Sequence, residues 1–350
     1  VQAVRQPGSS FKPFIYAAAL ENGYTPATLV NDAPVVFEDA ALESTWRPEN
    51  YSGRFYGPTR LREALAQSRN LVSIRVLRDI GVDTALDFLG RIGFDSDRMP
   101  ANLSLALGSA GVTPWELASG YAVFANGGYR VRPYFIDRIV SGSGDLIQAS
   151  RPTLTCAKCG ALEPPTVEGG GDTPVVRSEE NRQHLIPTFR PAERVMPPEN
   201  AYLMTTMLRD VVTSGTARRA QQLGRSDLAG KTGSTNELQD AWFAGYNEHL
   251  VTTTWVGFDD SRSMGPRETG SRAALPMWMD YMGAALEGVP EALMDRPEGL
   301  VTVRIDPESG RVTDASNPDA IFETFREGNV PPEEERRGGD SGGDGDSPLF

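Results

Sequence analysis

The most informative stretch of the chain runs Pro7-Gly8-Ser9-Ser10-Phe11-Lys12-Pro13 and continues into Phe14-Ile15-Tyr16-Ala17-Ala18-Ala19-Leu20 before Asn22-Gly23. An apolar run between a serine-rich start and a glycine predicts a helix with Ser9 near its N-terminus. Pro13 falls in the first turn, where its missing N–H costs little. The spacing Ser9-x-x-Lys12 sets a hydroxyl and an amine one turn apart on the same helical face, so the amine could take the hydroxyl proton.

Lys12 would have to be neutral to accept that proton, so its pKa must fall well below the reference value of about 10.4. Burial beside a second cation would lower it. The spacing alone is a weak signal, because about 0.2 matches are expected by chance among three lysines. A capped helix with a surface lysine is the simpler structural interpretation.

Lys231-Thr232-Gly233 is the more specific motif, with about 0.04 matches expected by chance. It lies in a predicted strand, 228–235, where glycine lets another backbone approach closely. A ligand peptide could pair with the edge of that strand. Its terminal carboxylate would then meet the Lys231 amine and the hydroxyls of Thr232, Ser234 and Thr235.

Ser68-x-Asn70 is the least specific motif and follows a helix predicted over 61–67. A polar cap at a helix end is its simpler explanation. The region before Lys231 also invites comparison with a phosphate-binding loop, Gly-x4-Gly-Lys-Ser/Thr. Gly224 is one residue too far from Gly230, and the residues after Thr232 make a poor helix start, so nucleotide binding is disfavoured.

The charge balance excludes further classes of function. The 350 residues carry a net charge of −13 at pH 7, which repels phosphate backbones, so no nucleic-acid partner is expected. Thirty-one of the 34 basic residues are arginine, and the lysines are Lys12, Lys158 and Lys231. Two histidines, His184 and His249, make a Ser-His-Asp triad or a multi-histidine metal site improbable. We expect neither a metal nor a cofactor.

Helical patterns fill the first 127 residues, and strand patterns then enter. Helices are predicted over 9–20, 61–67 with Thr59 as its cap, 71–80, 84–92, 114–125, 199–213 and 272–286. Strands are predicted over 228–235, 241–246, 250–258 and 300–305, with a hairpin around Ser141-Gly142-Ser143-Gly144. Short turns between the first three strands indicate an antiparallel meander. The predicted fold class is α/β, in its α+β form: an antiparallel sheet with an all-helical subdomain.

Four segments follow from these patterns. Residues 1–150 form the first part of a domain, and 199–330 form its second part with the sheet. Between them, 151–198 is a proline- and glycine-rich insertion. Residues 331–350 are predicted to be a disordered acidic tail.

Taken together and in this order, the three motifs resemble the signature of penicillin-recognising serine enzymes. Four further stretches are similar to class A penicillin-binding proteins of the 1a type. These stretches are Arg5-Gln6-Pro7-Gly8-Ser9, Leu105-Ala-Leu-Gly-Ser109 with Val112-Thr113-Pro114, Tyr121-Ala-Val-Phe-Ala-Asn126-Gly127, and Asp240-Ala-Trp-Phe-Ala-Gly-Tyr246. The resemblance implies the penicillin-binding transpeptidase or β-lactamase-like fold.

The resemblance also implies a serine D,D-transpeptidase that cross-links peptidoglycan and is the target of β-lactams. Ser9 is then the nucleophile, Lys12 its general base, Ser68 the proton relay to the leaving D-Ala, and Lys231 the cation that lowers the pKa of the base. Asn70 is expected to hold the donor peptide, and the N–H groups of Ser9 and Ser234 to form the oxyanion hole. Thr232, Gly233, Ser234 and Thr235 are expected to bind the substrate.

In this family, strands of the central sheet and a glycosyltransferase domain with a membrane anchor precede the helix that begins near Ser9. Only eight residues precede Ser9 here, so we expect the N-terminal strands to come from elsewhere in the protein or from a complementary fragment. We also expect this chain alone to fold poorly. The family places the domain at the periplasmic face of the bacterial inner membrane, with stem peptides as donor and acceptor and a lipoprotein activator as a further partner.

Two alternatives to the transpeptidase remain: a β-lactamase, and a non-catalytic penicillin sensor or scaffold. No second carboxylate of the lactamase kind stands out between Ser68 and Lys231. In the insertion, Cys156 and Cys159 form a C-x-x-C pair that an extracytoplasmic location favours as a local disulfide. A zinc site is the lesser alternative, because two more ligands are missing.

Overall fold

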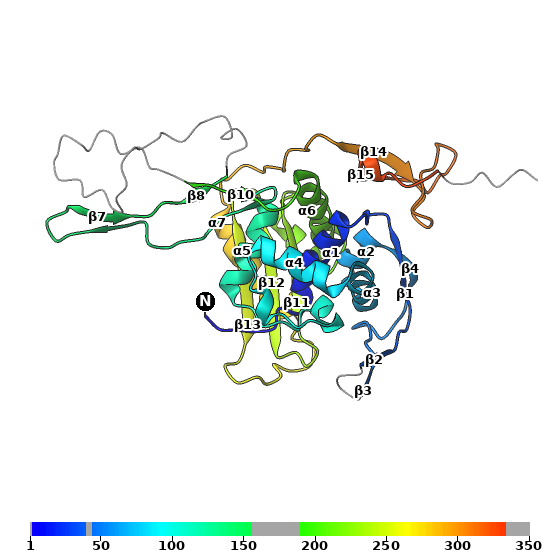
Figure 1. Cartoon of the computed structure of the whole chain (residues 1–350), viewed down its shortest axis with the longest axis horizontal. Helices are drawn as coiled ribbons and strands as arrows, with labels where there is room; N and C mark the ends of the chain where they lie inside the picture. Colours follow the sequence, from blue (N-terminus) through cyan, green and yellow to red (C-terminus); the bar gives the residue numbers. More distant parts are fainter. Residues whose placement is uncertain (1, 40–43, 156–189, 334–350) are drawn as a thin grey trace, which may run out of the picture.

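A computed structural model of the chain describes residues 2–39, 44–155 and 190–333 (Figure 1). The α-helices in this part are α1 (Lys12–Glu21), α2 (Leu61–Ala66), α3 (Asn70–Ile80), α4 (Val82–Ile92), α5 (Pro114–Ala125), α6 (Pro198–Thr213) and α7 (Leu275–Ala285). Shorter helical turns are η1 (Gly8–Phe11), η2 (Ser96–Arg98), η3 (Leu103–Leu107), η6 (Arg218–Leu223), the π-helical η7 (Gly270–Ala274) and η8 (Glu327–Asn329). Within the described residues, no helix has both the length and the apolar character that a membrane crossing requires.

The main sheet is the predicted antiparallel meander. Its order is β11-β12-β13, from β11 (Ala229–Ser234), β12 (Asp240–Tyr246) and β13 (Val251–Gly257). The smaller strands are β1 (Leu29–Asp32), β2 (Phe37–Asp39), β3 (Ser44–Trp46), β4 (Gly57–Arg60), β5 (Tyr129–Arg130), β6 (Arg138–Val140), β7 (Leu146–Ala149), β8 (Thr153–Leu154), β9 (Arg190–Pro191), β10 (Glu193–Arg194), β14 (Leu300–Ile305) and β15 (Ile321–Arg326). In the described part of the chain, β11 and β13 are edge strands.

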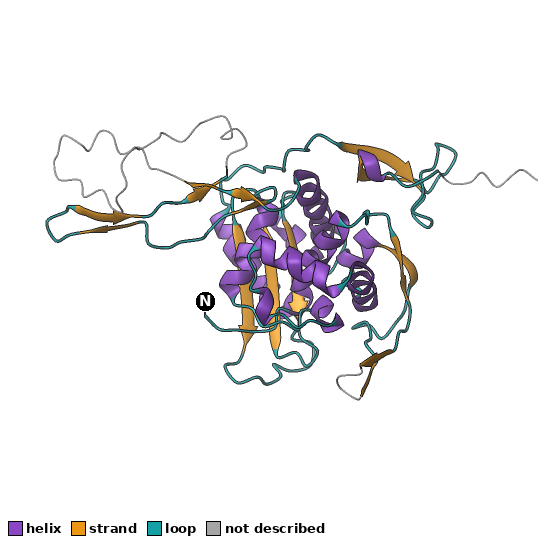
Figure 2. Ribbon diagram, in the orientation of Figure 1, coloured by secondary structure: helices purple, strands orange, loops and turns teal. Residues whose placement is uncertain are grey.

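Helices cover both faces of the sheet (Figure 2). Phe243 and Tyr246 on β12 are three positions apart and therefore point to opposite faces. The Phe243 ring packs edge-on against Trp278 of α7, with ring centroids 4.7 Å apart. The Tyr246 hydroxyl is 2.9 Å from the hydroxyl of Thr205 on α6, and its ring lies against Tyr121 of α5.

The central helix of the molecule is α1, because every residue from Lys12 to Leu20 is buried. It contacts α3, α4 and α6 within one large hydrophobic core. The predicted helix thus exists, but its first turn, which carries Ser9, is the 3₁₀ turn η1. Burial on all sides explains why a helix of low amphipathicity is stable here.

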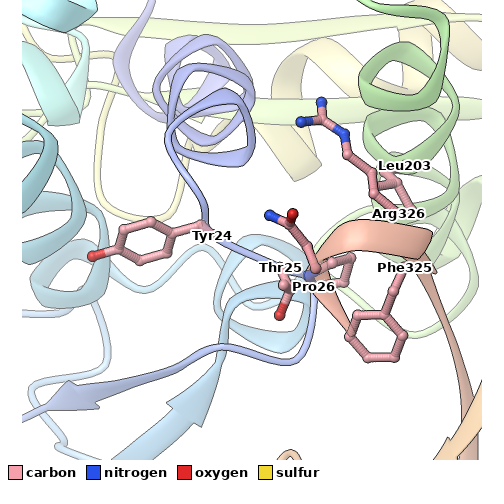
Figure 3. A pocket seen from close by; sticks show the side chains of 7 residues that line it. Tyr24, Thr25, Pro26, Leu203, Phe325 and Arg326 are labelled. Carbon is pink, nitrogen blue, oxygen red and sulfur yellow. The ribbon is translucent and has the colours of Figure 1, made fainter. Parts of the chain in front are cut away.

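The C-terminal hairpin docks on this core. Strands β14 and β15 pair antiparallel, and the Arg326 guanidinium donates to the Leu20 carbonyl oxygen at 3.2 Å. Figure 3 shows the junction, where Phe325 and Arg326 lie near Leu203 of α6 and the turn that contains Tyr24.

Most predicted elements are present, and α5 has the predicted bounds. The capping role of Thr59 was wrong: Thr59 lies in strand β4, its hydroxyl donates to the Gly57 carbonyl, and Arg60 occupies the cap position of α2. The predicted strand 300–305 is β14, while β15 and the short strands β1 to β4 were not predicted. Most of the predicted insertion 151–198 and nearly all of the predicted tail 331–350 lie outside the described residues.

Candidate active site

The turn η1 separates the two neighbouring serines. The Ser10 side chain is fully buried, and its hydroxyl donates to the Pro7 carbonyl oxygen at 2.8 Å. Ser9 is half-buried, and within the described residues its hydroxyl makes no hydrogen bond. The serine at the predicted spacing from Lys12 is therefore the one whose oxygen can meet an incoming ligand.

The Lys12 amine lies at the start of α1 and is fully buried. It donates to the Ser68 carbonyl oxygen at 2.8 Å, the Asn70 Oδ1 at 2.7 Å and the Ser68 Oγ at 3.3 Å. The expected hydrogen bond with the Ser9 hydroxyl is not formed in this state. Burial, then the charge of Lys231, hold the Lys12 pKa well below its ordinary value.

A second amine reaches the same hydroxyl from the sheet. Lys231 Nζ donates to Ser68 Oγ at 2.9 Å and to the Thr232 carbonyl oxygen at 3.1 Å. Lys231 is fully buried, so none of its side chain reaches solvent. Burial lowers the pKa of Lys231 to about 7.

Ser68 is the meeting point of the two lysines. A hydroxyl has two acceptor lone pairs and one proton, so an oxygen that accepts from both amines still has a proton to give. Ser68 also has a φ of 57°, which is the left-handed region that a non-glycine residue adopts at an energetic cost. The surrounding contacts hold it there and aim its carbonyl at Lys12.

Asn70 begins α3 and uses all of its polar groups locally. Its Oδ1 accepts from Lys12, and its Nδ2 donates to the Glu49 carbonyl oxygen at 2.8 Å. Its backbone N–H donates to the Asn50 Oδ1 at 2.8 Å. In this structure Asn70 therefore positions the Lys12 amine.

Three glycines let the segments of the site approach one another. A Cβ on Gly233 would lie 2.2 Å from the Pro7 carbonyl oxygen, and one on Gly8 would lie 2.4 Å from the Ser234 carbonyl oxygen. Gly108, in the left-handed region at φ 72°, would place a Cβ 2.1 Å from the Gly8 carbonyl oxygen. Only glycine allows η1 to lie this close to both β11 and the end of η3.

The backbone N–H of Ser234 points to the open edge of β11. Its neighbour, Thr235, donates its N–H to the Asp240 carbonyl oxygen on β12. Since hydrogen-bonded and non-bonded pairs alternate along an antiparallel ladder, the Ser234 N–H is directed away from β12. The turn η1 lies at that edge, where a Cβ on Gly8 would be 3.0 Å from the Ser234 nitrogen.

The hydroxyls after Lys231 have separate partners. Thr232 and Thr216 pair through their hydroxyls at 2.7 Å, and the Ser234 hydroxyl oxygen accepts from the Gly270 N–H at 2.9 Å. The Thr235 hydroxyl oxygen accepts from the N–H groups of residues 239 and 240 and so stabilises the turn between β11 and β12. Sequence reasoning missed Thr216, Gly270 and Asn50, because none belongs to a motif with a recognisable spacing.

The sequence also raised a disulfide at Cys156 and Cys159, with a zinc site as the lesser alternative. No group of metal-ligating side chains occurs within residues 2–39, 44–155 and 190–333. Cys156 and Cys159, predicted as a local disulfide, lie outside the described residues.

The buried lysine pair, the half-buried serine with a hydroxyl that is free within the described residues, and the glycine-packed strand together define a class of protein, which comparison with known families identifies. A family model described as the penicillin binding protein transpeptidase domain matches residues 1–262. The chain belongs to the penicillin-binding protein transpeptidase family.

Its relatives include penicillin-binding protein 1A of Pseudomonas aeruginosa, which is 48% identical over an alignment of 347 positions that covers 95% of this chain and 42% of that protein. Penicillin-binding protein 1A of Neisseria flavescens is 44% identical over 302 residues, 86% of this chain and 34% of the relative. The chain thus spans less than half the length of these curated relatives.

Solved structures share the fold. The crystal structure of penicillin-binding protein 1A from Haemophilus influenzae has a TM-score of 0.83 at 36% identity and covers 95% of this chain and 49% of its own. The PonA1 protein from Mycobacterium tuberculosis, solved in complex with penicillin V, has a TM-score of 0.63 at 22% identity, with 85% and 73% covered. The predicted family and fold class are confirmed.

Proposed function

We propose that the chain is the serine D,D-transpeptidase part of a peptidoglycan-synthesising enzyme and acts through an acyl-enzyme on Ser9. The observation that carries the proposal is the convergence of two buried amines, Lys12 and Lys231, on the Ser68 hydroxyl beside the helix that begins near Ser9. Burial of two amines costs free energy, and such a cost is typical of sites where the chemistry uses the lowered pKa that burial produces.

In the proposed reaction the Lys12 amine takes the Ser9 proton as the Ser9 oxygen attacks the carbonyl of the penultimate D-Ala. The N–H groups of Ser9 and Ser234 stabilise the oxyanion that forms. The bond to the terminal D-Ala then breaks, and Ser68 passes the proton from Lys12 to the leaving amine. An acceptor amine attacks the ester next, the bond between the acyl carbon and the Ser9 oxygen breaks as the new peptide bond forms, and the proton lost by the acceptor amine returns to the Ser9 oxygen through Lys12.

Substrate binding in the proposal depends on strand β11. The donor peptide pairs with its open edge, and Gly233 lets the two backbones approach. Lys231, Thr232, Ser234 and Thr235 provide a cation and hydroxyls for the terminal carboxylate. Asn70 contributes to the donor site while it positions Lys12. The chain as a whole is acidic, but binding of the carboxylate depends on the local positive charge at Lys231.

A β-lactam would acylate Ser9 in the same way, because its strained amide takes the place of the D-Ala-D-Ala bond. Within the described residues, no carboxylate hydrogen-bonds to Ser9, Lys12, Ser68 or Lys231. This supports a transpeptidase over a β-lactamase, which needs a group to activate a deacylating water.

The proposal extends to the setting of the domain. We place it at the periplasmic face of the inner membrane, where the polymer strands to be cross-linked lie. We propose that it acts in a protein that also has a membrane anchor and a glycosyltransferase domain. A lipoprotein activator is a further proposed partner.

Intact-protein mass spectrometry after addition of a penicillin tests the proposed function, with peptide mapping of the adduct. We expect one adduct on Ser9 that persists for hours, absent in Ser9→Ala and retained in the matched control Ser10→Ala. Turnover of penicillin with rapid loss of the adduct would indicate a β-lactamase. Absence of any adduct on folded protein would indicate a scaffold.

A further inference from the structure

Asp32 is a buried carboxylate next to the lysine site that the proposed mechanism does not use. It ends strand β1, and none of its surface reaches solvent. Both carboxylate oxygens accept from a single group, the Asn50 Nδ2, at 2.8 and 2.9 Å. Within the described part of the chain no arginine or lysine lies within ion-pair distance of Asp32. A buried charge without a cationic partner costs free energy, which indicates that Asp32 has a role beyond stability.

Asn50 transmits the position of Asp32 to the lysine site. Its Nδ2 also donates to the Arg54 carbonyl oxygen at 2.9 Å, so acceptors surround that end of the amide. The opposite end, Oδ1, must then face a donor, and it accepts the backbone N–H of Asn70 at 2.8 Å. This N–H opens α3 and has no partner within the helix, so Asn50 caps α3 from a distant segment.

The contacts form one continuous chain from Asp32 through Asn50 and Asn70 to the Lys12 amine. The Asp32 charge also acts on Lys12 directly, since it opposes the lowering of the Lys12 pKa by burial and by neighbouring cations. The charged groups that act on the Lys12 amine are Lys231 on β11 and Arg69 before α3, which lower its pKa, and Asp32, which raises it. The elements around the pair also carry Arg75, Arg78 and Asp79 on α3, Tyr16 and Glu21 on α1 and Arg60 on β4.

We propose that Asp32 and Asn50 are a positioning pair for the transpeptidase reaction: Asp32 holds the Asn50 amide in place, and Asn50 fixes the turn from Ser68 to Asn70 on which the Lys12 amine lies. Neither residue touches the substrate. Without Asp32, the charges of Lys231 and Arg69 would act on Lys12 unopposed, and its affinity for the Ser9 proton would fall.

The inference rests on the proposed acylation of Ser9, so its test measures the acylation rate with a fluorescent penicillin against pH in the intact protein. Failure of the wild-type protein to acylate would refute the proposed function itself. If the wild type acylates, the acid limb of its profile reports deprotonation of the base. Asp32→Asn should move the midpoint of this limb to lower pH, because the amine loses its stabilising anion.

Asp87→Asn is the matched control, an exposed carboxylate on α4 whose removal should leave the profile in place. Asp32→Glu keeps the charge and should retain the wild-type midpoint. An acid limb in Asp32→Asn that stays or moves to higher pH would overturn the proposal.

Asn50→Ala provides a second test, which applies even if Asp32→Asn does not fold. Truncation keeps the Asp32 charge and removes the contact with the Asn70 N–H, so the plateau rate should fall by roughly tenfold. In the double variant with Asp32→Asn, the loss in plateau rate should be smaller than the product of the two single losses. A plateau in Asn50→Ala within twofold of the wild type would contradict the positioning role.

Discussion

Lys231 shows how burial and function conflict at a single residue. Its amine is fully buried, makes its hydrogen bonds to neutral oxygens, and has a pKa of about 7 instead of the ordinary 10.5. The folded protein therefore binds this proton more weakly than the unfolded chain. Between pH 7 and 10.5 the unfolded state carries the extra proton, so the contribution of Lys231 to the free energy of unfolding rises with pH.

Lys231→Met should abolish acylation and stabilise the protein at neutral pH. We expect the free energy of unfolding at pH 7 to rise by roughly 1–4 kcal/mol, because an apolar side chain of similar length replaces a buried amine. The difference from the wild type should shrink as the pH rises from 7 to 10, because the cost of keeping Lys231 neutral in the folded state falls as the pH approaches the ordinary pKa of 10.5 in the unfolded chain. Urea denaturation at pH 7, 8.5 and 10 measures it, and a difference that grows with pH would contradict the assignment.

At the scale of elements, the site depends on how closely η1 lies between β11 and the end of η3. Gly8, Gly108 and Gly233 make this possible, since each is in contact with backbone atoms of another segment. The backbone of Ser9 is fixed by that packing. Its N–H group therefore has a defined direction before any ligand arrives, which is the preorganisation that an oxyanion site needs.

Gly108→Ala should destabilise the protein by roughly 2–4 kcal/mol and slow the acylation of Ser9. The added Cβ meets the Gly8 carbonyl oxygen, and φ 72° is unfavourable for alanine. Gly142→Ala is the matched control, because its Cβ would enter open space at an ordinary φ. Chemical denaturation of both variants checks the expectation, which fails if they differ by less than about 0.5 kcal/mol.

The elements that sequence predicted well carry their own local signals. α5 has Pro114 at its first position and a capping box between Thr113 and Glu116, so neighbouring residues in the sequence indicate where the helix begins. The meander β11-β12-β13 has short turns between its strands, and these turns can be recognised in the sequence. Strands β1 and β4 pair with each other although a segment separates them in the sequence, and each has four residues, which is too short for a recognisable alternation of apolar and polar residues. Thr59 lies in β4 because of this pairing, and it therefore does not cap α2.

The residues of the site likewise fall into those that the sequence predicted and those that only the fold reveals. Ser9, Lys12, Ser68, Asn70 and Lys231 belong to motifs with fixed spacing, and the structure brings Lys12, Ser68, Asn70 and Lys231 into one hydrogen-bonded cluster. Asp32, Asn50 and Thr216 reach the cluster through tertiary contacts, and their positions in the chain have no regular relation to it. Residues of this kind can be found only once the fold is known.

At the scale of the whole molecule, a buried ion-pair network joins the C-terminal hairpin to the helical core. Arg62 on α2 donates two hydrogen bonds of 2.7 Å to Glu323 on β15 and one of 2.8 Å to Asp210 on α6. The Glu323 side chain is only 3% exposed. A guanidinium in this position matches both carboxylates, and its removal leaves Glu323 buried without a cation.

Arg62→Met should release the hairpin from the core and cost about 3–5 kcal/mol, as the loss of one partner of a buried ion pair does. Hydrogen exchange in β14 and β15 should rise well above that in β12. The double variant Arg62→Met with Glu323→Met should recover much of the loss, since no unpaired charge is then buried. Equal exchange in the single variant and the wild type would show that other contacts hold the hairpin.

The central claim is that the lysine pair serves acyl transfer to an amine. The most direct measurement incubates the intact protein with a peptide ending in D-Ala-D-Ala and an amine acceptor, and quantifies free D-Ala and cross-linked product together. We predict one D-Ala released for each new cross-link, with both blocked by penicillin and lost in Ser9→Ala. Folded protein that binds the peptide but releases no D-Ala, or penicillin turnover in place of inhibition, would contradict the account.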